Sequence, residues 1–255
     1  MALSKGVKNL INTVSQDTQT QEELRGYLQD MLHAFGKVDS DYYISDPEYA
    51  DSEKAQRLYE RCFAYELYHQ LRQIMGHESR KADYTKVKLN GETGKNSKTY
   101  KRLFLESPIA LDNIQLEDFI NKCLKKYKKF SPDLILHQAS GFDHQVYMAE
   151  IKMDTNNDAL SDLKKLTDLR KSLGDLSNHT GENAGFYFYL FIYTGNLETK
   201  IEHVQNDTWN RISDITKTDH NIICLYRIKH QDNPKPVYKC MTLGEVVGIV
   251  KKKKQ

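Results

Sequence analysis

The chain contains two apolar segments of strand length that lie close together, SPDLILH at residues 131–137 and VYMAEIK at residues 146–152. Each segment also carries charge, with Asp133 in the first and Glu150 and Lys152 in the second. Charged side chains are rarely buried unless they are paired or bind a metal. The sequence therefore predicts two neighbouring buried strands that share a polar site.

The loop between these segments indicates how the strands pair. It contains the Gly, Ser and Asp that are typical of a hairpin connection. A symmetric hairpin with Gln138 opposite Gln145 places Asp133 opposite Glu150, with their Cβ atoms about 4.5–5.5 Å apart on one face of the sheet. Lys152 lies two residues beyond Glu150 and points to the same face.

Two carboxylates at this separation repel each other unless a cation lies between them. Their oxygen atoms suit a hard cation such as Mg²⁺, for which we expect Mn²⁺ to substitute. Such a cation lowers the pKa of its bound water and neutralises charge that develops on a phosphate. Lys152 can act as a base towards that water or stabilise the charge electrostatically, and the sequence leaves both roles open.

The residues Pro132-Asp133, followed after a gap by Glu150-Ile151-Lys152, resemble the signature of the PD-(D/E)xK, or restriction-endonuclease-like, nuclease superfamily. The core of that superfamily runs helix, three strands, helix, strand, and we expect this order over about residues 50–195. The resemblance implies that Asp133 and Glu150 bind the metal and that Ile151 contributes a backbone carbonyl. It implies that Lys152 orients or deprotonates the attacking water.

The resemblance also implies an acidic residue on the first core helix, which apolar periodicity predicts over residues 53–75. We prefer Glu66 as this catalytic and metal-binding residue because uncharged residues flank it at helical spacing. Glu60 on the same helix and Glu92 after the first strand are the alternatives.

Hydrophobic patterns predict the remaining elements. In chain order these are a helix at 21–35, a strand at 84–89, a helix at 158–173 ending at Gly174, a strand at 184–193, a helix at 200–215, paired strands at 222–228 and 237–240, and a helix at 243–250. The predicted fold class is α/β, a restriction-endonuclease-like core with extra N-terminal helices and a C-terminal α/β extension. We expect an N-terminal helical extension at 1–50, the nuclease core at 51–195, and a C-terminal extension with a disordered basic tail at 196–255.

Lysines concentrate just before the first motif strand and on the second core helix. Those expected to contact a nucleic-acid backbone are Lys125, Lys126, Lys128, Lys129 and Lys164. The alternative for both groups is the solvated face of an amphipathic helix. The net charge of +2 arises from 37 Lys and Arg against 35 Asp and Glu, which is too small to indicate nucleic-acid binding by itself.

The four cysteines show no CxxC spacing, which disfavours zinc and favours a reducing cytoplasm. No segment approaches the roughly 18 apolar residues that a membrane-spanning helix requires, so we expect no membrane partner. The combined prediction is a Mg²⁺-dependent endonuclease that hydrolyses phosphodiester bonds in double-stranded DNA, in restriction, repair or phage defence. A homodimer or a targeting protein partner would direct it. The alternatives are a structure-specific or RNA-directed nuclease, and a non-catalytic nucleic-acid-binding or assembly subunit with the same fold.

Overall fold

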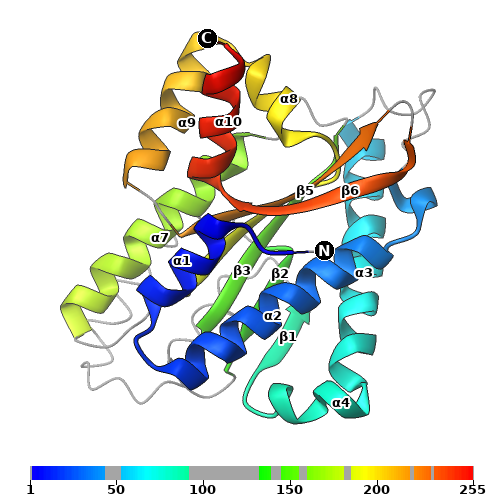
Figure 1. Cartoon of the computed structure of the whole chain (residues 1–255), viewed down its shortest axis with the longest axis vertical. Helices are drawn as coiled ribbons and strands as arrows, with labels where there is room; N and C mark the ends of the chain where they lie inside the picture. Colours follow the sequence, from blue (N-terminus) through cyan, green and yellow to red (C-terminus); the bar gives the residue numbers. More distant parts are fainter. Residues whose placement is uncertain are drawn as a thin grey trace.

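The computed structural model describes residues 2–43, 53–91, 132–138, 145–154, 160–180, 185–218, 221–230 and 233–254. Within these ranges the fold is mixed α/β, with a six-stranded sheet between helices (Figure 1). Some predicted site residues lie outside the described residues, namely Glu92, Lys125, Lys126, Lys128 and Lys129.

The strands occupy the sheet in the order in which they occur in the chain. They are β1 (Lys88–Gly91), β2 (Leu134–His137), β3 (Gln145–Lys152), β4 (Phe188–Tyr193), β5 (Ile222–His230) and β6 (Asn233–Thr242). The pairs β1–β2, β2–β3 and β5–β6 are antiparallel, whereas β3–β4 and β4–β5 are parallel. Because parallel neighbours need a crossover, helices connect β3 to β4 and β4 to β5.

The helices are α1 (Lys5–Val14), α2 (Thr18–Lys37), α3 (Glu53–Gly76), α4 (Glu78–Lys81), α7 (Ser161–Thr180), α8 (Leu197–Glu202), α9 (Asn206–Thr218) and α10 (Leu243–Lys253). Short 3₁₀ turns, η1 (Ser40–Tyr43) and η2 (Ala82–Tyr84), lie before and after α3 and α4. In the part of the chain that the structure describes, no helix combines the length and apolar character needed to cross a bilayer.

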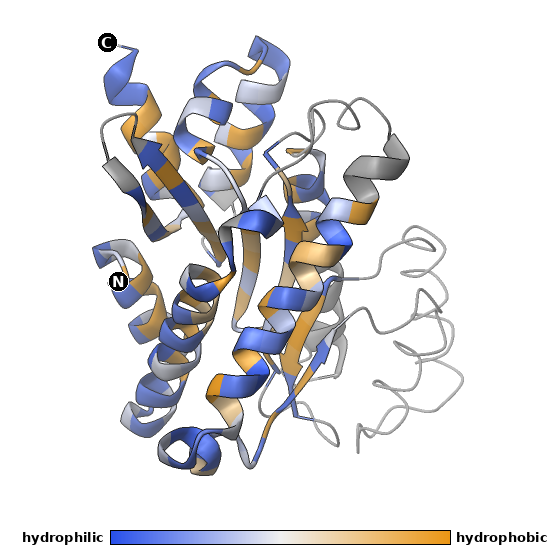
Figure 2. Cartoon of the chain, turned by 90° about the vertical axis from the view of Figure 1, so that its right-hand side faces the viewer, coloured by the Kyte–Doolittle hydropathy of each residue, from blue (hydrophilic) through white to orange (hydrophobic). Residues whose placement is uncertain are grey.

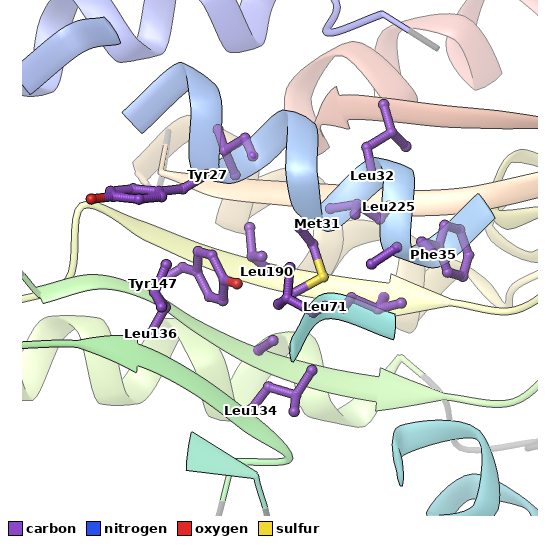
Figure 3. Packing of buried hydrophobic residues seen from close by; sticks show 14 of the residues in the cluster. Tyr27, Met31, Leu32, Phe35, Leu71, Leu134, Leu136, Tyr147, Leu190 and Leu225 are labelled. Carbon is purple, nitrogen blue, oxygen red and sulfur yellow. The ribbon is translucent and has the colours of Figure 1, made fainter. Parts of the chain in front are cut away.

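Two hydrophobic clusters form the core, one on each face of the sheet, because alternate strand residues point to opposite faces. The first contains residues of α1, α2 and α3, and Figure 3 shows Met31 and Phe35 of α2 packed together with Leu190 and Leu225 of the sheet. The second contains residues of α7, α8, α9 and α10. Figure 2 shows hydrophobic colour along the strands and hydrophilic colour on outward helix surfaces.

The described elements include the predicted order of one helix, three strands, a second helix and a fourth strand. These are α3, β1, β2, β3, α7 and β4. The predicted bounds of α3 are confirmed to within a residue. Two other bounds were wrong. The first strand begins at Lys88 and includes the expected turn residues Asn90 and Gly91, because both pair with β2. α7 continues through Gly174 to Thr180, which shows that one glycine, at a cost of about 1 kcal/mol, does not by itself end a helix.

The flanking regions also differ from the prediction. The sequence pattern missed α1, and the single helix predicted at 200–215 is two helices, α8 and α9. The paired strands and the last helix are confirmed. The basic tail is not disordered throughout, because α10 includes Lys251, Lys252 and Lys253, and the Lys253 ammonium lies 3.1 Å from a carboxylate oxygen of Glu198.

Candidate functional site

The β2–β3 hairpin brings Asp133 and Glu150 together. Leu134 pairs with Ala149 in the predicted register, and Asp133 and Glu150 are the residues next to this last pair of the ladder. The two carboxyls lie close enough for the charge of Asp133 to raise the pKa of Glu150. The Asp133 N–H donates to the Ala149 carbonyl at 3.0 Å. The Ile151 N–H donates to Asp133 Oδ2 at 2.7 Å, which fixes the orientation of this carboxyl.

The register shifts at the other end of the hairpin. A bulge between Leu136 and His137 sets His137 opposite Gln145, where the symmetric hairpin placed Gln138. The predicted pairing was therefore wrong there, but it holds near Asp133. His137 is buried, accepts a hydrogen bond from Asn90 Nδ2 at 2.7 Å, and donates from Nδ1 to the Gln138 carbonyl at 2.8 Å. Burial lowers the pKa of His137, so the ring is held neutral as part of the core.

Glu150 is a buried acid on a strand that is otherwise apolar. It is only 5% exposed, and in the sheet it pairs with Phe191 of β4. Burial raises its pKa well above the ordinary value, and the charges of Asp133 and Asp162 raise it further. Within the described residues, Glu150 Oε1 has no hydrogen-bond partner. An unpartnered buried carboxyl oxygen is the feature expected of a ligand-binding atom.

Asp133 is half-buried beside it. Burial raises the pKa of Asp133 to about 7, against the opposing effects of the Lys152 ammonium and the Ile151 N–H. The negative charges of Glu60 and Asp162 add to the increase. Both acids of the hairpin therefore lie in surroundings that disfavour their charged forms.

Lys152 forms two ion pairs at the end of β3. Its Nζ lies 2.7 Å from Glu60 Oε1 and 3.0 Å from Asp162 Oδ2, and its side chain is 12% exposed. Burial opposes the charged form of Lys152, but the Glu60 and Asp162 carboxylates outweigh it and raise its pKa. Lys152 is therefore an ammonium at neutral pH in this state.

The two partners of Lys152 come from opposite layers of the fold. Glu60 lies on α3, whose apolar residues belong to the first core cluster, and Asp162 lies on α7, which contributes to the second. β2 begins at Leu134, so the described β2 ladder does not extend alongside the last residues of β3. At this end of the sheet, side chains from both faces reach Lys152.

On α3, the structure brings Glu60 to Lys152, whereas the sequence analysis preferred Glu66. Glu66 accepts a hydrogen bond from Gln70 Nε2 at 2.6 Å, whereas Glu60 binds Lys152. The reason lies in helical spacing. Glu60 continues the buried stripe of Ala64 and Leu67 by one turn, but Glu66 points away from that stripe. Glu60, which the sequence offered as the alternative, is the α3 residue that joins the site.

Asp162 is a site residue that the sequence analysis missed. It lies in the first turn of α7, is only 2% exposed, and forms ion pairs with Lys152 and Lys165. A signal was present, because position 162 belongs to the inward stripe that includes Leu163 and Leu166. An acid in such a stripe needs a buried partner. Lys164, predicted to bind nucleic acid, is exposed and forms an ion pair with Asp168 at 2.7 Å.

The site carries more acids than bases. Its members are the four carboxyl groups of Asp133, Glu150, Glu60 and Asp162 and the ammonium groups of Lys152 and Lys165. When all are ionised, the formal charge is −2, which a divalent cation would neutralise.

The groups that could hold such a cation are the carboxyls of Asp133 and Glu150 and the Ile151 carbonyl. The Ile151 carbonyl qualifies because the N–H and C=O of one strand residue point to the same side, and its N–H points to Asp133. Among the described residues, no three His, Cys, Asp or Glu side chains are grouped closely enough to hold a metal. Mg²⁺ does not require such a group, since it is commonly bound by one or two carboxylates and completes its shell with water and substrate.

Comparison with known proteins gives no significant match to a family model, to a curated protein or to a solved structure.

Proposed function

We propose that this protein is a metal-dependent phosphodiesterase of the restriction-endonuclease type that cleaves DNA. The observation that supports this most directly is the proximity of Asp133 and Glu150 at the end of the β2–β3 ladder. One buried oxygen of Glu150 has no hydrogen-bond partner among the described residues, and the Lys152 ammonium follows two residues further along β3. The order of elements from α3 to β4, with Asp133 directly before β2 and Glu150 on β3, resembles the order in which that nuclease type carries its signature.

The proposed roles follow from the geometry. The carboxyls of Asp133 and Glu150 and the Ile151 carbonyl would hold Mg²⁺ or Mn²⁺, which would supply an activated water and neutralise charge on the phosphate. The Lys152 ammonium would orient that water and stabilise the negative charge that develops on the phosphate. It does not act as the general base in the state described, because Glu60 and Asp162 raise its pKa. Glu60 and Asp162 are positioning residues that hold the ammonium in place.

The test is cleavage of supercoiled plasmid with Mg²⁺ or Mn²⁺, compared with chelator. We expect cleavage by the wild type only with metal, and a loss of about 100-fold or more in Asp133→Asn and Lys152→Gln. Asp214→Asn and Lys217→Gln make the same chemical changes at an exposed ion pair on α9 and serve as matched controls. Cleavage by Asp133→Asn at the wild-type rate would refute the proposed site.

Substrate preference is tested in the same assay with duplex DNA, single-stranded DNA and RNA of one sequence. We propose duplex DNA as the preferred substrate. Faster cleavage of branched or single-stranded DNA would instead support a structure-specific nuclease, and cleavage of RNA alone would support an RNA-directed one. Both alternatives use the same residues, so the loss in Asp133→Asn should accompany either activity.

A second candidate function is a non-catalytic nucleic-acid-binding or assembly subunit. One observation favours it, namely that Lys152 is already held by Glu60 and Asp162 and that Lys165 also pairs with Asp162. Such a network can serve the fold alone. Calorimetric titration with Mn²⁺ separates the two candidates, because the catalytic proposal expects binding that is lost in Asp133→Asn. Absence of Mn²⁺ binding by the wild type would favour the second candidate.

A further inference from the structure

A hollow lies between α7, α8 and α9, on the face of the sheet opposite α2. Its volume is about 430 Å³, which falls within the range of small-molecule binding sites. Four basic side chains line it, Lys164, Lys200, His203 and Arg211. Ile212 and Ile215 of α9 give it an apolar portion. The helices that surround it are grouped together in Figure 1.

The charge of this pocket is largely uncompensated. None of its lining residues in the described part of the chain is acidic. Within the described part of the chain, Lys200 forms no ion pair, and Arg211 uses only Nε, which donates to the Asp207 backbone carbonyl at 3.3 Å. Lys164 pairs with Asp168, but its side chain is 62% exposed, and an exposed pair of this kind contributes little. An anion in the pocket would therefore meet positive charge without first having to break a strong ion pair.

Two helices begin at the pocket and add to this potential. α7 starts at Ser161, which lines the pocket, and α9 starts at Asn206, between the lining residues Gln205 and Thr208. Helix N-termini favour anions because their first N–H groups lack helical partners. The pocket thus combines basic side chains, two adjacent helix N-termini and an apolar portion, an arrangement suited to a phosphate attached to a sugar or a base.

The pocket and the carboxyl site share the first turn of α7. Ser161 and Lys164 line the pocket, whereas Asp162 and Lys165 face the site. The two are thus separated by about the width of one helix, about 10 Å. One strand of a duplex advances about 3.4 Å per nucleotide, so this separation corresponds to about three nucleotides.

We propose that this pocket binds a nucleotide phosphate, with Lys200 and Arg211 as the principal contacts and Ile212 and Ile215 against the apolar part of the same nucleotide. When the ligand is a polynucleotide, the pocket holds a phosphate about three nucleotides from the phosphate at the carboxyl site. This placement rests on the proposed function. The same chemistry would recognise a free nucleotide, and the experiment distinguishes the two sources.

The test is fluorescence anisotropy of a labelled duplex oligonucleotide in chelator, so that binding is measured without cleavage. The variant is Lys200→Gln with Arg211→Gln. Lys217→Gln with Lys252→Gln is the matched control, since it also removes two positive charges and both positions are exposed and outside the lining. We expect the pocket variant to bind at least about 10-fold more weakly, with a salt slope lower by about one for each lost phosphate contact. The control should stay within about twofold. Arg211→Gln alone, at an exposed position, covers the case in which the double variant fails to fold.

The competing ligands are dAMP and inorganic phosphate. A loss of oligonucleotide binding in the pocket variant assigns the pocket to the polynucleotide backbone. Unchanged oligonucleotide binding with loss of dAMP binding assigns it to a free nucleotide. If the pocket variant binds the oligonucleotide, dAMP and inorganic phosphate each as tightly as the wild type does, the inference is overturned. Pocket-dependent binding without cleavage would leave the inference standing and remove the proposed function, whereas Asp133-dependent cleavage with unchanged binding would do the reverse.

Discussion

Replacement of Asp133 by asparagine should stabilise the metal-free protein. Asp133 is half-buried among Glu150, Glu60 and Asp162, and burial raises its pKa to about 7. A carboxyl in such surroundings prefers to be neutral, so at alkaline pH its ionisation destabilises the fold. Asparagine is neutral at every pH, and its amide oxygen can still accept the hydrogen bond from the Ile151 N–H.

The size of the effect follows from the pKa. The difference between 3.8 and about 7 corresponds to about 4 kcal/mol in the free energy of unfolding. The sign follows from linkage, because a folded-state pKa above the unfolded value means that the native state binds the proton more tightly. Wild-type stability is therefore reduced fully above about pH 7, partly between pH 7 and 4, and not at all below pH 4. We expect Asp133→Asn to be more stable than the wild type by about 2–4 kcal/mol at pH 8, and by less than 2 kcal/mol at pH 5.

Urea unfolding in chelator, followed by fluorescence of the single tryptophan Trp209 and by circular dichroism, measures this difference. Asp214→Asn is the control, because it makes the same chemical change at a carboxyl that is 71% exposed. Saturating Mg²⁺ should stabilise the wild type at about pH 8 and leave Asp133→Asn unchanged. A variant that is less stable than the wild type at both pH values would refute the argument that crowding of buried acids strains this site.

Three further predictions concern other parts of the structure. Glu60→Gln should reduce cleavage by about 100-fold, whereas Glu66→Gln should remain within about threefold of the wild type in the same plasmid assay. His137→Gln should weaken the decline in wild-type stability between about pH 7 and pH 5, because burial lowers the pKa of His137 and acid must charge a buried ring; an unchanged slope in urea unfolding would contradict this. Glu198→Gln should cost about 3 kcal/mol in thermal unfolding at neutral pH, because the buried carboxylate accepts from Lys239 at 2.6 Å. The pKa of Glu198 is lowered because hydrogen bonds from its partners outweigh burial, so this stabilisation should fade as the pH falls below about 4.5.

The hairpin at the site could be predicted because it is local. Side chains alternate along a strand, so one choice of loop fixes which residues of β2 and β3 oppose each other. The confirmed pair of Leu134 and Ala149 shows that this reasoning holds near Asp133. The bulge at His137 could not be predicted in the same way, because it leaves the hydrophobic pattern intact and depends on contacts such as that with Asn90 of β1.

The two helix acids of the site, Glu60 and Asp162, differ in how far the sequence could have identified them. The position of Glu60 one turn before Ala64 was available in the sequence, and stricter use of helical spacing would have preferred it to Glu66. Asp162 also lay in a recognisable stripe. Its partner Lys152 lies on a strand in another part of the chain, and such pairings are set by how α7 packs on the sheet.

The N-terminal helix is a second case in which distant contacts decide local structure. Ser4 caps α1 and also donates to Glu245 Oε2 at 2.6 Å, and the Gly6 N–H donates to Glu245 Oε1 at 2.7 Å. Glu245 in turn completes the capping box of α10 with Thr242. A 10-residue helix has little stability alone, so these links to the far end of the chain help to place it.

The four acids of the site form two pairs, an outer pair of Glu60 and Asp162 and an inner pair of Asp133 and Glu150. Glu60 and Asp162 hold Lys152, while Asp133 and Glu150 lack a lysine at ion-pair distance among the described residues. The inner pair can be neutralised by protons, as their raised pKa values indicate, or by a cation. Because protons and a cation would compete for the same oxygen atoms, metal binding by these two acids should release protons near neutral pH. A half-buried and a buried acid that cost this much stability are expected where a ligand other than the proton binds them, and the outer pair keeps Lys152 charged beside that ligand.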